Sequence, residues 1–200
     1  MVREDALIDA AVAEAALPGE AESGDLHLIA PHEGGVLVAA IDGLGHGREA
    51  AEAARTARST LERDPAADLP DLFVSAHSAL ARSRGVVMSL ASFARSGRLT
   101  WLGVGNVEGT LVRGDVRPVR RADSILLLGG VVGFQLPPLR PSTTLVEPGD
   151  LLILATDGIM GGYLPGLDPT ARPKALADRI LAEHGRGADD ALVLVARYLG

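Results

Sequence analysis

The segment AAIDGLGHGREAAEAARTA, residues 39–57, constrains the fold of this 200-residue chain more than any other stretch. An apolar run ends in Asp42, three glycines follow at alternate positions, and an alanine-rich segment with helical periodicity begins. This order predicts a buried strand, a glycine-rich turn and an amphipathic helix. Such turns often bind phosphate groups, but the Asp42 carboxylate would repel a phosphate. A cation between the carboxylate and the phosphate would remove this conflict.

Two kinds of nucleotide-binding loop can be compared with this turn. The dinucleotide loop needs a third glycine in the pattern G-x-G-x-x-G, and Arg48 occupies that position. The phosphate-binding P-loop needs glycine, lysine and then serine or threonine in succession, and the chain has no such tripeptide. Both nucleotide interpretations are therefore disfavoured.

Acidic residues recur at the ends of other predicted strands. Asp157 and Gly158 end a second apolar run, Asp25 precedes the run LHLIAP, and Asp189 and Asp190 precede the last one. Each carboxylate alone could be a helix cap or a turn former. Together they predict a convergent cluster, whose members would raise one another's pKa unless cations were bound. Oxygen ligands without cysteine favour Mg²⁺ or Mn²⁺.

The rest of the chain predicts mainly antiparallel strands. We expect eight to ten strands and three or four helices, in an α+β arrangement of meanders and not a βαβ repeat. The segment 117–146 predicts only short strands and turns. The predicted strands are 26–31, 35–42, 85–94, 98–105, 107–114, 150–158 and 189–199, and the predicted helices are 47–62, 70–82 and 173–184. The alanine-rich segment 6–17 is compatible with a helix, but the turn-like residues directly after it favour a strand. No linker or repeat divides them, so residues 1–200 are expected to form one domain.

Composition excludes several classes of function. The formal net charge is −7 with no run of five basic residues, so the chain lacks the electrostatic footprint of a nucleic-acid-binding protein. It contains no cysteine, which excludes disulfides and thiolate metal sites. Its apolar runs are too short to span a bilayer, and its N-terminus lacks a signal-peptide core. We expect a cytoplasmic protein that binds neither nucleic acid nor membranes.

The motifs SGD, IDGLGHG, TDG and DD, in this order over residues 23–190, resemble the metal-dependent PP2C-type serine/threonine phosphatases. The likeness is to their SpoIIE-like bacterial branch, and the short chain is most similar to the stand-alone stressosome phosphatases, the RsbX-like group. The resemblance implies a PP2C-like α-β-β-α sandwich, in which helices flank two antiparallel sheets. It also implies that residues 1–200 form a single catalytic domain.

The resemblance further implies a site with two Mn²⁺ or Mg²⁺ ions. Asp42 would bridge both ions, and Gly43 would offer its carbonyl to one. Asp157 and Asp189 would complete the shell of the second ion, and Asp25 would act through water or a third, weaker ion. Asp42 and Asp157 would act catalytically through a metal-bound water that attacks phosphorus in line.

Other polar residues near these motifs are expected to have structural roles. His46 in the glycine-rich turn and Asn106 in the turn GVGN are interpreted as structural, and Asp190 as pointing away or contacting a metal ligand. No clear arginine near the N-terminus is available to hold phosphate, since Arg3 is expected to be solvated.

The resemblance implies that the substrates are phosphorylated STAS-domain proteins of a stressosome (RsbS/RsbR-like), whose dephosphorylation resets a bacterial stress pathway. We expect the enzyme to act as a monomer. Two alternatives stay open at this point. The chain could be an inactive PP2C-fold docking module, although its intact set of acidic positions argues against this, or a general phosphoesterase that acts on small molecules.

Overall fold

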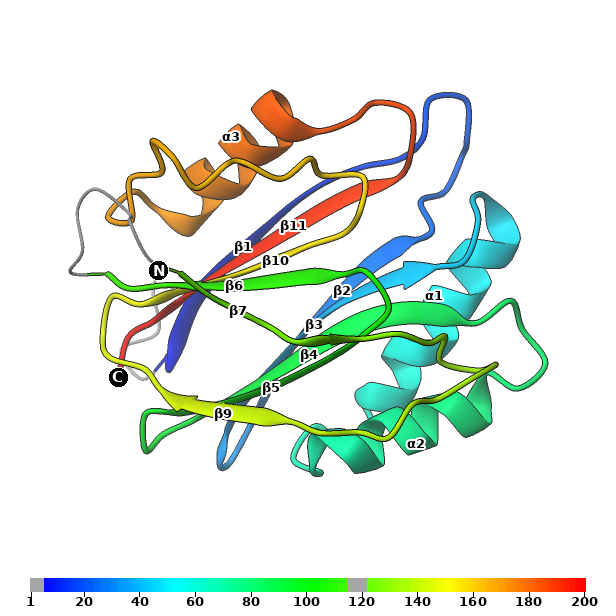
Figure 1. Cartoon of the computed structure of the whole chain (residues 1–200), viewed down its shortest axis with the longest axis horizontal. Coiled ribbons are helices and arrows are strands. Elements are labelled where there is room, and N and C mark those ends of the chain that lie inside the picture. Colours follow the sequence, from blue (N-terminus) through cyan, green and yellow to red (C-terminus); the bar gives the residue numbers. More distant parts are fainter. Residues whose placement is uncertain (1–5, 115–121) are drawn as a thin grey trace.

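Two β-sheets, antiparallel except for one short strand pair in the described residues, pack face to face in the computed structural model, which describes residues 6–114 and 122–200 (Figure 1). The five-stranded sheet has the order β1-β11-β10-β6-β7, and all its pairs are antiparallel. The first and last strands of the chain are neighbours in this sheet. Its strands are β1 (Ile8–Ala15), β6 (Glu108–Val112), β7 (Ala122–Ser124), β10 (Leu151–Ala155) and β11 (Ala191–Tyr198).

The second sheet has six strands in the described residues. Its order is β2-β3-β4-β5-β8, and β9 pairs with β5. Only the short pair β5–β8 is parallel within the described part of the chain. The strands are β2 (Asp25–His32), β3 (Gly35–Gly43), β4 (Val86–Ala94), β5 (Arg98–Val104), β8 (Leu127–Leu128) and β9 (Ser142–Leu145).

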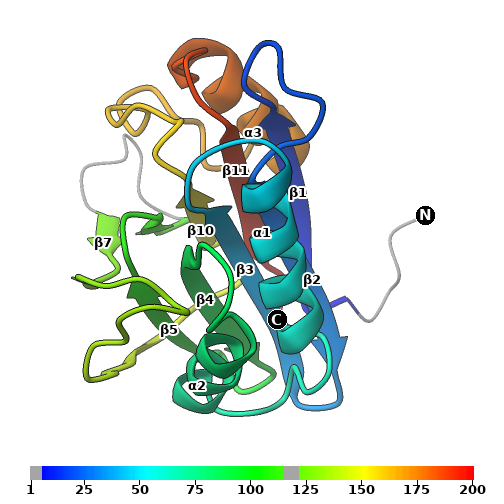
Figure 2. The same ribbon diagram turned by 90° about the vertical axis from the view of Figure 1, so that its right-hand side faces the viewer.

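Helices cover the outer faces of both sheets. The helices α1 (Arg48–Leu61) and α2 (Leu69–Ala79) lie on the second sheet, and α3 (Pro173–His184) lies on the first. Figure 2 shows α1 lying along β2 and β3. The alanine stripe of α1 is buried against this sheet, because small side chains allow the helix to approach the strands closely. The predicted α+β sandwich is confirmed.

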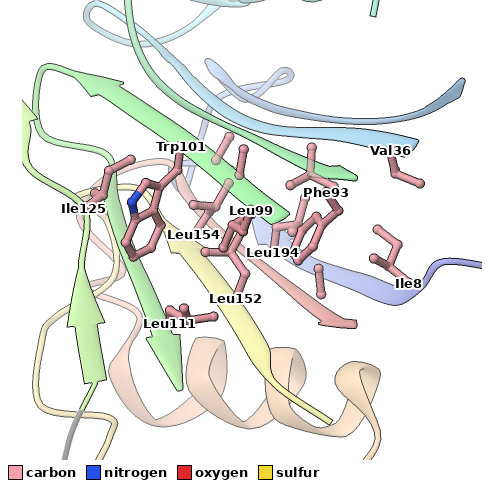
Figure 3. Packing of buried hydrophobic residues seen from close by; sticks show 14 of the residues in the cluster. Ile8, Val36, Phe93, Leu99, Trp101, Leu111, Ile125, Leu152, Leu154 and Leu194 are labelled. Carbon is pink, nitrogen blue, oxygen red and sulfur yellow. The ribbon is translucent and has the colours of Figure 1, made fainter. Parts of the chain in front are cut away.

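Side chains that alternate between the two faces of the central strands build the core. In β3, Val36 and Val38 point between the two sheets, whereas Leu37 and Ile41 point toward α1 and α2. Burial on both faces explains why such strands read as continuous apolar runs in the sequence. Figure 3 shows the inter-sheet cluster, in which Trp101 packs with leucines of both sheets.

The described residues 122–146 form short strands and turns, as expected from the sequence. Three short strands, β7, β8 and β9, bring the count within the described residues to eleven strands and three helices, against eight to ten strands predicted. These strands are too short for periodicity to reveal them, and they exist because β5 and β6 offer free edges for pairing. Arg3 lies outside the described residues. Within the two described ranges, the three helices are too short or too polar to pass through a membrane.

Candidate active site

Two of the predicted site residues face each other across a strand pair. Asp25 begins β2 and Asp42 lies near the end of β3, and the register makes them direct partners. Alternation places Asp42 on the same face as Val38 and Ala40, which is the face between the two sheets. Asp25 is fully buried and Asp42 is half-buried. The pair therefore lies at one end of the gap between the sheets.

The end of β10 approaches this pair from the opposite sheet. The Thr156 hydroxyl donates a hydrogen bond to Asp25 Oδ2 over 2.7 Å, and it accepts one from the Leu192 amide at 2.9 Å. Thr156 thus joins the last strand of one sheet to the first acidic residue of the other. Asp157 follows directly and is exposed at the same end of the sandwich. In the motif TDG, Thr156 therefore makes a contact between the sheets, and Asp157 places a carboxylate at the same end of the sandwich.

The two acidic residues before β11 have different surroundings. Asp189 is exposed and accepts a hydrogen bond from the Asp190 amide at 2.9 Å. Asp190 is buried, and its two carboxylate oxygens accept hydrogen bonds from the amides of Leu17 and Gly24 at 2.8 and 2.7 Å. Asp190 therefore holds the β1–β2 loop, which leads directly into Asp25. The structure gives it a positioning contact next to the site.

Close backbone packing explains the glycine that follows each strand-end aspartate. A Cβ on Gly43 would lie 2.2 Å from the Ala50 carbonyl oxygen of α1. A Cβ on Gly158 would lie 1.9 Å from the Asp190 carbonyl oxygen. Neither glycine has a positive φ, so the requirement is space and not backbone conformation. These contacts hold the Asp42 turn against α1 and the Asp157 turn against β11.

Burial and mutual repulsion raise the pKa values of the paired carboxyls. Desolvation is the largest cause for both residues. For Asp25, the Thr156 hydrogen bond opposes the shift, Asp190, Asp157 and Asp189 add to it, and the pKa rises to about 7. For Asp42, Asp25 is the next cause after desolvation, followed by Asp157, and the pKa rises to about 8. Acidic residues from both sheets are thus close enough to raise the pKa values of Asp25 and Asp42.

The donor set fits divalent cations. Among the described residues, no hydrogen-bond or ion-pair partner is found for the Asp42 carboxylate, although it is half-buried among acidic neighbours. No three described acidic or histidine side chains already form a group that could hold an ion. Hydrogen bonds from Thr156 and Asn106 instead engage Asp25 and Asp157. A cation would compensate the clustered negative charge and lower the raised pKa values.

The sequence predicts only a structural role for Asn106, in a turn between two strands. In the structure it lies between β5 and β6, and its Nδ2 donates a hydrogen bond to Asp157 Oδ2 at 2.8 Å. Thr156 and Asn106 were thus the two contacts to the acidic residues that the sequence did not assign. Thr156 stood within the TDG motif, so its position next to Asp157 was a usable signal. For Asn106 the only signal was a polar residue in a glycine-flanked turn.

The glycine-rich turn is joined to the β1–β2 loop by a histidine. His46 is exposed, and its Nδ1 lies 2.7 Å from Glu20 Oε1. Gly47 precedes α1 with a φ of 71°, and a Cβ there would contact the Glu20 carboxylate. These contacts accord with a structural role for His46, which stays a prediction.

Comparison with known proteins gives a consistent picture. The family model for Stage II sporulation protein E (SpoIIE) matches residues 32–199. A search of curated protein sequences finds no match. A chain from a structural study of the bacterial stressosome is 28% identical with a TM-score of 0.85, covering 95% of this chain and 99% of its own.

Two further solved structures share the fold at lower identity. RsbX in complex with magnesium is 20% identical with a TM-score of 0.84, covering 99% of this chain and 98% of its own. The PP2C phosphatase domain of SpoIIE from Bacillus subtilis, solved with a fragment of its regulatory domain, is 21% identical with a TM-score of 0.78. That match covers 96% of this chain and 64% of the solved one.

Proposed function

Because the chain belongs to the SpoIIE family of PP2C-type serine/threonine phosphatases, we propose that it hydrolyses phosphoserine and phosphothreonine in proteins. One observation carries this proposal. Acidic residues from two different sheets meet at one end of the sandwich, and the pKa values of Asp25 and Asp42 are raised there. Such perturbed carboxyls are typical of functional sites. We also propose that residues 1–200 form one catalytic domain, since both sheets contribute to this cluster.

We propose that two Mn²⁺ or Mg²⁺ ions bind to the acidic cluster. Asp42 would hold both ions, the Gly43 carbonyl one of them, and Asp157 and Asp189 the other, with Asp25 acting through water or a weaker third ion. Support comes from related folds, because RsbX was solved with magnesium and the catalytic domain of the serine/threonine phosphatase PstP with two manganese ions. Such ions lower the pKa of water and neutralise phosphoryl charge.

The protein's own contribution is to hold these ligands in place. Thr156 fixes one oxygen of Asp25, Asn106 fixes one oxygen of Asp157, and Asp190 holds the loop before Asp25. Each contact restricts a carboxylate or its backbone before a ligand arrives, which lowers the entropy cost of assembling the site.

For the substrate, we propose phosphorylated STAS-domain proteins of a stressosome. The support is the likeness to a chain from the stressosome study and to RsbX, together with the sequence motifs. The net charge of −7 gives no long-range attraction for a phosphorylated protein, so a folded surface should dock around the site. The cytoplasmic location and the monomeric state expected from the sequence stay predictions.

The test is Mn²⁺-dependent release of phosphate from a phosphorylated STAS protein, compared with a free phosphopeptide from the same protein. We expect a higher kcat/KM for the folded protein, because remote contacts help to position the phosphoryl group. Equal values would favour a general phosphoesterase. Binding without turnover would favour an inactive docking module, and Asp42→Asn serves as the inactive control.

A further inference from the structure

A phosphorylated substrate brings more negative charge to a site that is already acidic. A phosphoryl group carries about −1.5 to −2 charge at pH 7 and offers three strong acceptor oxygens. Arginine matches this geometry best among the side chains. The arginines of α1 are already paired with glutamates, since Arg48 contacts Glu52 and Arg55 contacts Glu22. The loop between α2 and β4 supplies a different candidate, Arg84.

The backbone around Arg84 lies against the glycine-rich turn. The carbonyl of Gly85 accepts a hydrogen bond from the Leu44 amide at 3.1 Å, so this loop is attached to the residue after Gly43. The Arg84 side chain continues over the same turn, because its Nη1 lies 2.7 Å from the place that a Cβ on Gly45 would occupy. The guanidinium therefore lies directly on the turn that begins at Asp42.

The absence of a side chain at Gly45 makes this position possible. Gly45 has a φ of 88°, which favours glycine, and any Cβ would also displace the guanidinium. The turn is thus open on the side where Arg84 lies. A phosphate bound at this glycine-rich turn would then be held by Arg84 together with the turn.

One contact orients the guanidinium and leaves most of it available. Arg84 Nη2 pairs with Glu49 Oε2 in the first turn of α1 at 2.5 Å. Within the described residues, no partner is found for the hydrogens on Nη1, and about half of the side chain is exposed. A guanidinium has five N–H donors, so one ion pair leaves donors for a ligand. Glu49 therefore limits the rotamers of Arg84 without saturating its donors.

We propose that Arg84 is a phosphate-binding residue that donates hydrogen bonds to the phosphoryl oxygens of the substrate and to inorganic phosphate as product. The inference rests on the proposed phosphatase function and adds a residue to that site. Glu49 acts as a positioning residue by holding the guanidinium over Gly45.

The test uses Arg84→Met, which keeps most of the side-chain stem and removes the charge. Calorimetry of the Mn²⁺-loaded protein with inorganic phosphate measures binding without turnover. We expect phosphate affinity to fall about 10-fold or more, the usual effect of losing hydrogen bonds to a charged group. KM for the phosphopeptide should rise, Mn²⁺ affinity should stay unchanged, and Arg84→Lys should recover part of the loss.

Arg82→Met is the matched control, because it removes the same charge from the same loop two residues away. It should leave phosphate affinity and KM unchanged. Unchanged phosphate affinity in Arg84→Met would overturn the proposal, as would an equal loss in Arg82→Met or a parallel loss of Mn²⁺ affinity. A wild type that does not bind phosphate would also overturn it. A wild type that binds phosphate but hydrolyses no phosphoprotein would refute the phosphatase function alone.

Discussion

At the scale of single residues, Asp25 and Asp42 carry an electrostatic conflict. They are cross-strand partners, both are at least half-buried, and acidic residues of the other sheet add to their repulsion. Without a cation, the folded protein lowers this cost by keeping the carboxyls protonated, which is what the raised pKa values express. The folded protein is therefore less stable when Asp25 and Asp42 are both ionised without a bound cation than when they are protonated or bind a cation.

The first prediction concerns the pH dependence of stability without metal. The folded pKa values of about 7 and about 8 lie above the unfolded value of 3.8, so the folded state binds protons more tightly. The resulting stability is present at low pH and is lost as pH rises through about 7 to 8. The melting temperature in EDTA should fall between about pH 5 and about pH 9. Asp42→Asn should show a weaker decline, and equal slopes would contradict the electrostatic assignment.

The second prediction is that Asp42→Asn abolishes phosphate release while the fold is kept. Losing a residue that only hydrogen-bonds to a metal ligand lowers metal affinity about 10–100-fold. Losing Asp42, which would itself bind both ions, should lower metal affinity more. Circular dichroism would establish folding, and Mn²⁺ titration and phosphate release would measure function. A folded variant with nearly wild-type turnover would remove the basis of the two-metal assignment.

The third prediction concerns Asn106, which holds Asp157 in place. Asn106→Ala should reduce Mn²⁺ affinity by up to about 10–100-fold, because Asp157 loses its hydrogen-bond donor. Since Asn106 is exposed, the melting temperature of the metal-free protein should change little. Mn²⁺ affinity equal to that of the wild type would limit Asn106 to the turn role that the sequence suggested.

At the scale of elements, the site depends on how closely a helix and a strand approach two turns. Gly43 lies against the backbone of α1, and Gly158 lies against the residues that lead into β11. A side chain at either place would push an element away from the acidic residues that it supports. The close backbone contacts therefore impose glycine at both positions.

The fourth prediction compares two glycines that are three residues apart. Gly158→Ala should destabilise the fold by about 1–3 kcal/mol or more, because its Cβ would lie 1.9 Å from a backbone oxygen. Gly161→Ala should be nearly neutral, since nothing lies within 4 Å of its Cβ and its φ is not positive. Urea unfolding would measure both, and equal effects would refute the packing argument.

At the scale of the whole molecule, the acidic cluster joins the two halves of the sandwich. Asp25 and Asp42 belong to one sheet, whereas Asp157 and Asp189 adjoin strands of the other. Two hydrogen bonds link the halves directly at this cluster, from Thr156 to Asp25 and from the Gly24 amide to Asp190. Ions bound between these residues would add a further link, so metal binding and global stability should be coupled.

The fifth prediction follows from this coupling. EDTA should inactivate the protein, and Mn²⁺ or Mg²⁺ should restore activity and raise the melting temperature. An ion at 100 times its dissociation constant adds about 2.7 kcal/mol to the free energy of unfolding. Asp42→Asn should show little of this stabilisation. Full activity in excess chelator, or no thermal shift in the wild type, would contradict the expectation.

The sequence alone predicted the elements whose patterns are local. The strand-turn-helix segment around Asp42, the helix that became α3 and the long apolar strands were all predicted near their observed places. The acidic residues at strand ends also predicted a cluster, because the apolar runs beside them identified which ends were buried. Periodicity and composition suffice where a segment's own residues decide its structure.

Only the tertiary structure decided which side chains contact one another. The register that sets Asp25 opposite Asp42 depends on the β2–β3 pairing, and the Thr156 contact depends on how the two sheets stack. Asn106 and Asp190 reach the acidic residues, and Arg84 reaches the glycine-rich turn, through turns whose directions no local pattern encodes. The short strands β7, β8 and β9 likewise exist only because neighbouring edges pair with them. These features arise from contacts between residues far apart in the chain, so the physical information that determines them is absent from any single segment.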